Sequence, residues 1–204
     1  MTIDWAGKTL TFNGCKASGN GFIMVEGTLI LTNSVGNGGC VVENTLDTNW
    51  MFRDNGTLIF NGGTYTHEGN GKNFDYIVSL YAQDNSHCYM EVNDGTFNAG
   101  ETAFRPMAAG GNGSGDITMV MNGGTVNGMW PFFLQMTGAN CPITFTMNGG
   151  VINAEYGVAY AQANTDCHNA ITMNIKDGTV NILEADTSEN PSYNSILYPS
   201  HLSG

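Results

Sequence analysis

The stretch "ITMVMNGGTVNG", from Ile117 to Gly128, contains the unit on which the fold depends. Apolar and polar residues alternate up to Met121, the pair Gly123-Gly124 interrupts this alternation, and a second short alternating run follows. Period-two alternation is typical of a strand with one buried face, and consecutive glycines are typical of a tight turn with positive φ. The stretch therefore predicts a strand, a sharp bend and a second strand.

The same unit recurs every 26 to 32 residues along the chain. Two shorter, more degenerate copies precede the regular ones, at Gly27–Leu31 and Lys8–Cys15. A repeat of this period indicates a solenoid, in which each unit buries its apolar face against its neighbours. The regular copies align on Gly63, Gly95, Gly124, Gly150 and Gly178.

Three columns of this alignment are apolar and predict the core. They are Leu58, Met90, Met119, Phe145 and Met173; Phe60, Val92, Met121, Met147 and Ile175; and Tyr65, Phe97, Val126, Ile152 and Val180. A third apolar segment follows in each repeat, and "LYAQDN" (Leu80 to Asn85) aligns with "AYAQAN" (Ala159 to Asn164). The pattern predicts an all-β, right-handed parallel β-helix of about six to seven coils, with three short strands per coil.

We expect one domain over residues 1–204. Within it, residues 1–33 form degenerate N-terminal coils, and residues 34–183 form the regular coils. Residues 184–204 leave the repeat consensus. They predict a loop followed by a capping strand, which is either a last third strand or a cover for the open end of the stack.

Two polar columns accompany the apolar ones. The first is Asn61, Asn93, Asn122 and Asn148, and the second is Asn98, Asn127, Asn153 and Asn181. Amides stacked at equivalent positions can hydrogen-bond along the stack, so both columns are interpreted as structural ladders. A regular array of ligand-binding amides is the alternative.

Composition excludes several classes of partner. The net charge is −12, from 18 acidic and six basic residues, which argues against nucleic acid and disfavours acidic polysaccharides. No apolar window is long enough to insert into a membrane, and the N-terminus lacks the features of a signal peptide. Five cysteines without close spacing predict free, buried thiols, with a Cys141–Cys167 pair as the alternative. No motif predicts a metal site or a cofactor.

At this point a family resemblance is visible. The opening "TIDWAGKTLTFNG" with "GTLILTNS", followed by "GTLIFNGGTY" and "MNGGTVNG" units, resembles the pectate-lyase-like right-handed β-helix. More narrowly it resembles the repeat regions of bacterial surface proteins and adhesins, and phage fibres use similar helices. The resemblance implies the fold, whereas the superfamily includes lyases, hydrolases, adhesins and passive spacers.

The competing hypothesis is that the protein is a carbohydrate-active enzyme of the β-helix superfamily. Polysaccharide lyases of this fold resemble one another in a catalytic Arg or Lys, often near Pro, and in clustered acidic calcium ligands. Here "FRP", Phe104 to Pro106, is the one segment similar to the first feature, and the acidic residues are not clustered. A hydrolase needs two facing carboxylates, for which Asp94, or Glu101 with Glu155, is the available candidate. Asp94 in "NDG" is also ordinary turn chemistry. A polysaccharide hydrolase or lyase is therefore the runner-up to a non-enzymatic protein.

The third segment "WPFFLQM" offers the candidate binding residues. If Phe132, Leu134 and Met136 face inward, the alternate residues face outward beside Trp130. Neighbouring coils then add one side chain on each side, which gives a platform for stacking a sugar or contacting a protein. The alternative is that a loop or the terminal segment covers these rings. The candidate ligand-binding residues are Trp130, Phe133, Gln135, Arg105 and Tyr156.

These observations favour a non-enzymatic structural and binding module of a cell-surface adhesin-like protein or fibre. Its partner would be a glycan or protein on a host or neighbouring cell surface. We expect an extracellular location on the bacterial cell surface, or on a virion if the chain is a phage fibre or capsid-decoration protein. A homo-oligomer is compatible with this interpretation, and it would be a trimer in a fibre.

Overall fold

The computed structural model describes residues 1–14, 21–43, 50–69, 75–83, 85–109, 115–136, 141–163, 171–183 and 197–201. All regular secondary structure in these residues is β-strand. The strands are β1 (Thr2–Asp4), β2 (Thr9–Asn13), β3 (Ile23–Val25), β4 (Thr28–Thr32), β5 (Gly39–Glu43), β6 (Trp50–Asp54), β7 (Thr57–His67), β8 (Tyr76–Ala82), β9 (His87–Ala99), β10 (Thr102–Ala108), β11 (Asp116–Met121), β12 (Thr125–Gly128), β13 (Phe132–Met136), β14 (Ile143–Met147), β15 (Val151–Ala154), β16 (Ala159–Ala163), β17 (Ile171–Ile175), β18 (Thr179–Ile182) and β19 (Leu197–His201).

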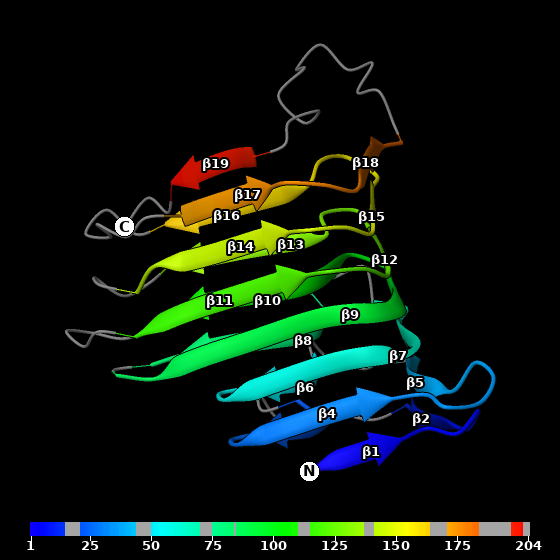
Figure 1. Ribbon diagram of the computed structural model, residues 1–204. Helices are drawn as coiled ribbons and strands as arrows, with labels where there is room; N and C mark the ends of the chain where they lie inside the picture. The colour runs from blue at the N-terminus through cyan, green and yellow to red at the C-terminus, as the bar shows by residue number, and fades with distance from the viewer. Residues whose placement is uncertain are drawn as a thin grey trace.

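The strands stack as a parallel β-solenoid, which confirms the predicted fold class (Figure 1). Sheet A contains twelve strands, including the path β1-β4-β7-β9-β11-β14-β17, and sheet B runs β3-β6-β8-β10-β13-β16-β19. Strands β2, β5, β12, β15 and β18 belong to sheet A on the far side of the bend. The chain thus passes from the first face of sheet A, around the bend, to the second face, and then to sheet B.

The number of coils and of strands per coil differs slightly from the prediction. About five turns carry the complete repeat, and shorter degenerate turns precede them. In two of the turns the strands on either side of the bend are continuous, as β7 and β9, because the two strands stay paired through the bend. Register shifts next to Asn61 absorb the bend in this pair.

The bend itself requires glycine. Gly124 has a φ of 81°, and a Cβ atom there would lie 2.7 Å from the carbonyl oxygen of Gly95 on the neighbouring coil. A larger residue would meet both a left-handed backbone and a backbone contact from the stacked coil. The predicted bend is thus a close approach between coils as well as a turn.

The predicted core columns lie inside the solenoid. Their members from Leu58 to Ile152 are all buried, as are Phe52, Val78, Phe104 and Phe132 from sheet B. The last members differ from the expectation, since Ile175 is 42% exposed and Met173 and Val180 are half-exposed. These three lie on β17 and β18, which pair with the previous coil on one side only.

Sheet B corrects the alignment of the third segments. Leu80 is in register with Pro106, Leu134 and finally Ala161, so the matching "YAQ" letters are offset by two residues. The offset keeps the same residues facing inward, which is why the hydrophobic pattern did not reveal it. At the end of the chain, β19 pairs with β16 as the last strand of sheet B, while residues 184–196 lie outside the described residues.

Candidate functional site

The outer face of sheet B collects both arginines of the chain. Arg53 on β6 and Arg105 on β10 share one column, with Ser79 of β8 between them. Their flanking residues point into the core, where Phe52 and Phe104 are buried. The alternation of the strand therefore turns both arginines outward, and each is half-exposed.

Aromatic rings surround both guanidinium groups. The Cζ atom of Arg53 lies 4.4 Å from the ring centroid of Tyr81 and 5.9 Å from that of Trp50. The Cζ atom of Arg105 lies 5.0 Å from the centroid of Tyr76 and 5.6 Å from that of Trp50. Trp50 is thus shared by the two cations. Distances of this size allow a cation–π attraction, which is stronger where water is excluded.

Gln135 fixes the orientation of Arg105. Its Oε1 atom accepts a hydrogen bond of 3.0 Å from Nε of Arg105 and a second from Nη2. Burial lowers the pKa of Arg105, but a guanidinium remains protonated in a protein. A positive charge is therefore held in place over the rings of Trp50 and Tyr76 in this acidic protein.

A row of ring contacts continues along the sheet. Phe133 stacks on Tyr76 with 6.1 Å between centroids and lies 5.3 Å from Tyr160. Trp130 lies 6.0 Å from Tyr160 and 6.3 Å from Tyr156. Contacts of this length are typical of packed aromatic pairs. We call the set the aromatic face: Trp50, Tyr76, Tyr81, Trp130, Phe133, Tyr156 and Tyr160.

Of the five candidate residues predicted from the sequence, Trp130, Phe133 and Tyr156 belong to the aromatic face and Arg105 and Gln135 lie beside it. They are not equally accessible. Phe133 points outward as predicted, yet it is only 3% exposed, because rings of the same face pack on it. Trp130, Tyr156, Gln135 and Arg105 are half-exposed. Phe133 therefore supports the neighbouring rings, and Trp130 and Tyr156 are the candidate rings a ligand can reach.

Sequence reasoning missed four of the seven rings of the aromatic face and one of the two arginines beside it. Trp50, Arg53, Tyr76, Tyr81 and Tyr160 were not among the candidates. One signal was available: the dipeptide Phe-Arg occurs at residues 52–53 and again at 104–105, two coils later. The two copies place the two arginines in one column.

Two carboxylates lie at the edge of the aromatic face. The backbone N–H of Asp75 donates to Oε2 of Glu101 at 3.1 Å. A Cβ atom built on Gly69 would lie 3.6 Å from Cγ of Glu101 and 3.9 Å from Oδ2 of Asp75. The two carboxylates, with Arg105, are among the charges that act on the Tyr76 hydroxyl, although burial is the main reason that its pKa is raised.

The carboxylate pair expected for a hydrolase, Glu101 and Glu155, lies on either side of Gly128 in the stack. The Glu155 N–H donates to the Gly128 carbonyl at 3.0 Å, and a Cβ atom on Gly128 would lie 3.0 Å from the Glu101 carbonyl oxygen. Glu155 lines a groove of about 320 Å³ together with Met129 and Leu183, and Glu101 is not part of that lining. Asp94 Oδ1 accepts a hydrogen bond of 2.8 Å from the N–H of Gly95, as a turn residue does. Asp94 is thus a turn residue, whereas the backbones of Glu101 and Glu155 approach each other through Gly128.

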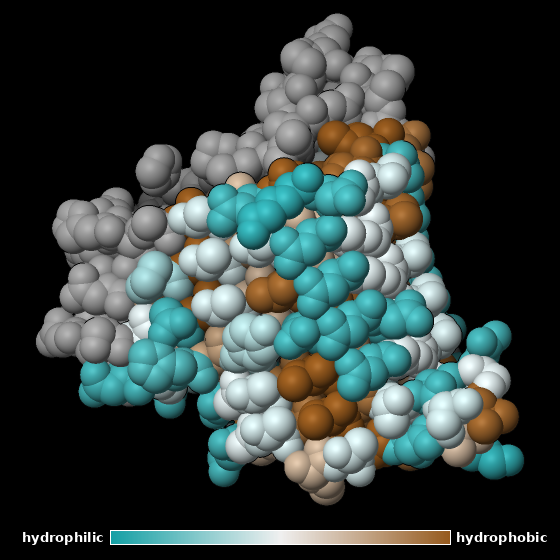
Figure 2. Space-filling model, viewed as in Figure 1, coloured by the Kyte–Doolittle hydropathy of each residue, from teal (hydrophilic) through white to brown (hydrophobic). Residues whose placement is uncertain are grey.

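The two columns of asparagines form hydrogen-bonded ladders. In the first, Nδ2 of Asn93, Asn122 and Asn148 each donates to Oδ1 of the preceding asparagine at 2.8–2.9 Å. In the second, Asn127, Asn153 and Asn181 repeat this contact at 2.8 Å. Figure 2 shows the first as a hydrophilic band across the ends of β7, β9, β11 and β14.

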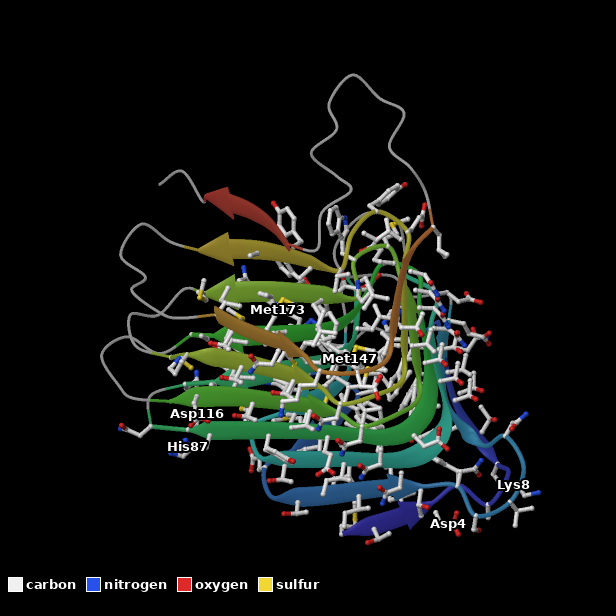
Figure 3. All side chains as sticks on the ribbon, turned by 45° about the horizontal axis from the view of Figure 1, so that its top comes forward. Asp4, Lys8, His87, Asp116, Met147 and Met173 are labelled. Carbon is white, nitrogen blue, oxygen red and sulfur yellow. The ribbon has the colours of Figure 1, made fainter. Side chains whose placement is uncertain are left out.

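Thiols and histidines give no further site in the described part of the chain. Cys40, Cys88 and Cys141 are buried free thiols. Burial raises the pKa of the Cys88 thiol to about 12, which removes its nucleophilic thiolate at neutral pH. His87 contacts Asp116 at the end of two neighbouring strands (Figure 3). Cys15, Cys167 and His168 lie outside the described residues.

The described residues contain neither a metal-binding cluster nor a membrane-spanning helix. No group of three or more histidine, cysteine, aspartate or glutamate side chains is placed to hold a metal ion. None of the described elements is a helix long and apolar enough to cross a membrane.

In comparisons with known proteins, the chain matches no protein-family model, no curated protein and no solved structure.

Proposed function

We propose that the protein is a non-enzymatic structural and binding module of a cell-surface adhesin-like protein or fibre, and that its aromatic face binds a glycan. The observation that carries the proposal is the cluster of half-exposed rings of Trp130, Tyr156 and Tyr160 beside the Arg105–Gln135 pair. Rings that are packed edge to edge on a sheet are rigid, so a ligand that stacks on them costs little ordering entropy. The repeated coils supply the scaffold.

A neutral sugar fits this surface better than a charged one. The C–H faces of a pyranose stack on exposed rings, and its hydroxyl groups can exchange hydrogen bonds with tyrosine hydroxyls and an amide. The net charge of −12 repels acidic polysaccharides, and the carboxylates of Glu101 and Asp75 lie at the edge of the face. We therefore propose a neutral glycan as the ligand class.

Binding to a glycan array, followed by calorimetry with each bound glycan, tests the proposal. We expect Trp130→Ala to weaken binding about tenfold or more, since loss of one stacked ring removes on the order of 1–2 kcal/mol. Tyr89→Ala is the matched control, because Tyr89 is a half-exposed aromatic residue on the outer face of sheet A. Unchanged binding by both Trp130→Ala and Tyr156→Ala would remove the aromatic face as the site.

The enzyme hypothesis is tested with the same ligands. Glu101 and Asp75 approach each other beside the aromatic face, which is the specific observation in its favour. A hydrolase would release reducing ends from the bound glycan, and a lyase would form unsaturated uronates. Either product, abolished by Glu101→Gln at unchanged glycan affinity, would replace the non-enzymatic proposal. Intact glycan after prolonged incubation supports it.

A further inference from the structure

Asparagine is followed by glycine at ten positions of the chain, and such pairs are chemically labile. The nitrogen of the glycine can attack the side-chain amide carbon of the asparagine, and glycine has no side chain to hinder the approach. Asn20, Asn70 and Asn112 begin three pairs outside the described residues. The seven pairs that the structure describes begin at Asn13, Asn37, Asn55, Asn61, Asn122, Asn127 and Asn148.

Hydrogen bonds decide which of the seven pairs can react. The side-chain amide must turn onto the glycine nitrogen, and this nitrogen must give up its proton to become a nucleophile. A hydrogen bond that holds the side chain, or one that the glycine N–H donates, has to break first. The reactive pair is therefore the one in which both groups are free.

The two asparagine ladders hold the side chains of four pairs. Asn122 takes part in three contacts, since Nδ2 donates to Asn93 and Glu91 and Oδ1 accepts from Asn148. The hydrogen bonds that join the coils thus also shield these pairs from attack. The four shielded side chains are those of Asn61, Asn122, Asn127 and Asn148.

Two more pairs are engaged by carboxylate groups and backbone oxygens. Nδ2 of Asn13 donates to Oε1 of Glu43 at 2.6 Å, and the N–H of the following glycine donates to the Glu43 carbonyl oxygen at 3.2 Å. After Asn55, the N–H of Gly56 donates to Oδ1 of Asp54 at 2.9 Å. In both pairs the attacking nitrogen already has an acceptor, so it is a poor nucleophile.

Asn37 is the exception. It is exposed and lies in the segment between β4 and β5 (Figure 1). Neither its side chain nor the N–H of Gly38 has a hydrogen-bond partner among the described residues. Asn61 is also exposed and lines the same polar groove, so water reaches both side chains, and the ladder bond of Asn61 distinguishes them.

We propose that Asn37 is a site of spontaneous covalent modification. The nitrogen of Gly38 loses its proton to a base in the solvent and forms a bond to Cγ of Asn37, and the side-chain nitrogen leaves as ammonia. Water then opens the resulting succinimide ring at either carbonyl carbon, which leaves aspartate or isoaspartate. The net reaction consumes one water molecule and turns the amide into a carboxylate and an ammonium ion.

The isoaspartate product would disturb the strand that follows. It routes the backbone through the side chain of residue 37, which lengthens the chain directly before Gly38 and Gly39. A Cβ atom on Gly38 would lie 2.6 Å from the carbonyl oxygen of Lys8, and one on Gly39 would overlap the carbonyl oxygen of Thr64. Because no space is left there for a longer backbone, the modification should loosen the pairing of β5 with β2 and β7.

Peptide mapping of the full chain by mass spectrometry, after incubation at neutral and at mildly alkaline pH, tests the proposal. Each conversion replaces an NH group by oxygen and is located by its mass. We expect Asn37 to convert about tenfold or more faster than Asn122, since the contacts of Asn122 must break first. The rate at Asn37 should rise with pH, because the attacking nitrogen must lose a proton. In denaturant the seven pairs should convert at similar rates.

Two variants separate the effect of the ladder from that of the modification. Asn93→Ala removes the ladder partner of Asn61, so it should speed conversion at Asn61 and leave the rate at Asn37 unchanged. Asn37→Gln changes an exposed side chain and should fold as the wild type does, but it should keep its melting temperature on ageing while that of the wild type falls. An Asn37 that reacts no faster than Asn122 in the folded protein overturns the proposal, and an aged, converted wild type that melts like the fresh protein overturns the expected effect on β5.

Discussion

The two faces of sheet A and the outer face of sheet B are built on the same coils, yet they differ in how strictly they repeat. Along sheet A, most of the regular coils place an apolar residue, an asparagine and a glycine at equivalent positions, and the ladders and the bend follow from that repetition. Along sheet B, the outward positions change from coil to coil: Arg53, Ser79 and Arg105 occupy one column. Repetition therefore marks what holds the coils together, and its absence marks where particular side chains are displayed.

The bend of sheet A offers the strongest test of this division. Gly124→Val should destabilise the protein by about 3–5 kcal/mol, because it combines positive φ with a backbone contact at 2.7 Å. Gly27→Val is the matched control, since a Cβ atom there meets nothing within 4 Å. Chemical denaturation of both variants measures the difference. Equal, small losses for the two would show that the bend can relax and that its glycine is not required.

Sheet B also contains a buried carboxyl group, that of Asp54, which makes the stability of the protein depend on pH. Asp54 takes an inward position in a column that continues with Leu80 and Pro106, and it is fully buried. Its Oδ1 atom accepts a hydrogen bond from Gly56, whereas Oδ2 has no partner. Burial raises the pKa of Asp54 from 3.8 to about 7. The folded protein thus keeps this carboxyl protonated over a range in which the unfolded chain ionises it.

The sign of the effect follows from proton binding. Between pH 4 and 7 the folded state holds one more proton than the unfolded state, so stability falls as the pH rises. The full loss is on the order of 4 kcal/mol and is complete above about pH 7. Asp54→Asn keeps an acceptor for Gly56 and cannot ionise, so its stability should stay nearly level over this range. A wild-type curve as flat as that of Asp54→Asn would contradict a buried, protonated carboxyl.

The contrast between the faces also explains what the sequence could and could not predict. The core columns and bends were predictable because a strict repeat aligns them without any knowledge of contacts. The third strands were aligned two residues out of register, because "YAQ" occurs both at 81–83 and at 160–162. A shift of two residues leaves the same side chains facing inward, so the hydrophobic pattern could not reveal the error. Buried Asp54 was not foreseen either, since "RDNG" has the composition of an ordinary turn.

The candidate site was predictable only in part, for a related reason. Trp130, Phe133 and Gln135 could be grouped because they lie on one segment, and Arg105 and Tyr156 because they lie on adjacent coils. Trp50 contributes from two coils below Arg105, through a side chain that reaches along the stack. Contacts that span several coils depend on rotamers rather than on periodicity, so an alignment of repeats does not contain them.

The smallest expected effect belongs to a single rung of the first ladder. Nδ2 of Asn122 donates to Asn93 and to Glu91, and its Oδ1 accepts from Asn148. Asn122 is exposed, so water can replace these partners, and Asn122→Ala should cost about 1 kcal/mol of unfolding free energy. Asn174→Ala, at an exposed position of sheet A outside both ladders, is the control and should cost less.

A double-mutant cycle at neighbouring rungs shows whether the asparagines of the ladder stabilise one another. If the rungs support one another, Asn122→Ala combined with Asn93→Ala will cost less than the sum of the two single changes, because the first substitution already breaks their shared hydrogen bond. Strict additivity would show that each amide is held by water and backbone rather than by its neighbours. In that case the asparagine ladders would add little to the free energy of unfolding. The glycines of the bend, and not the asparagines, would then be the repeated residues that hold neighbouring coils of sheet A together.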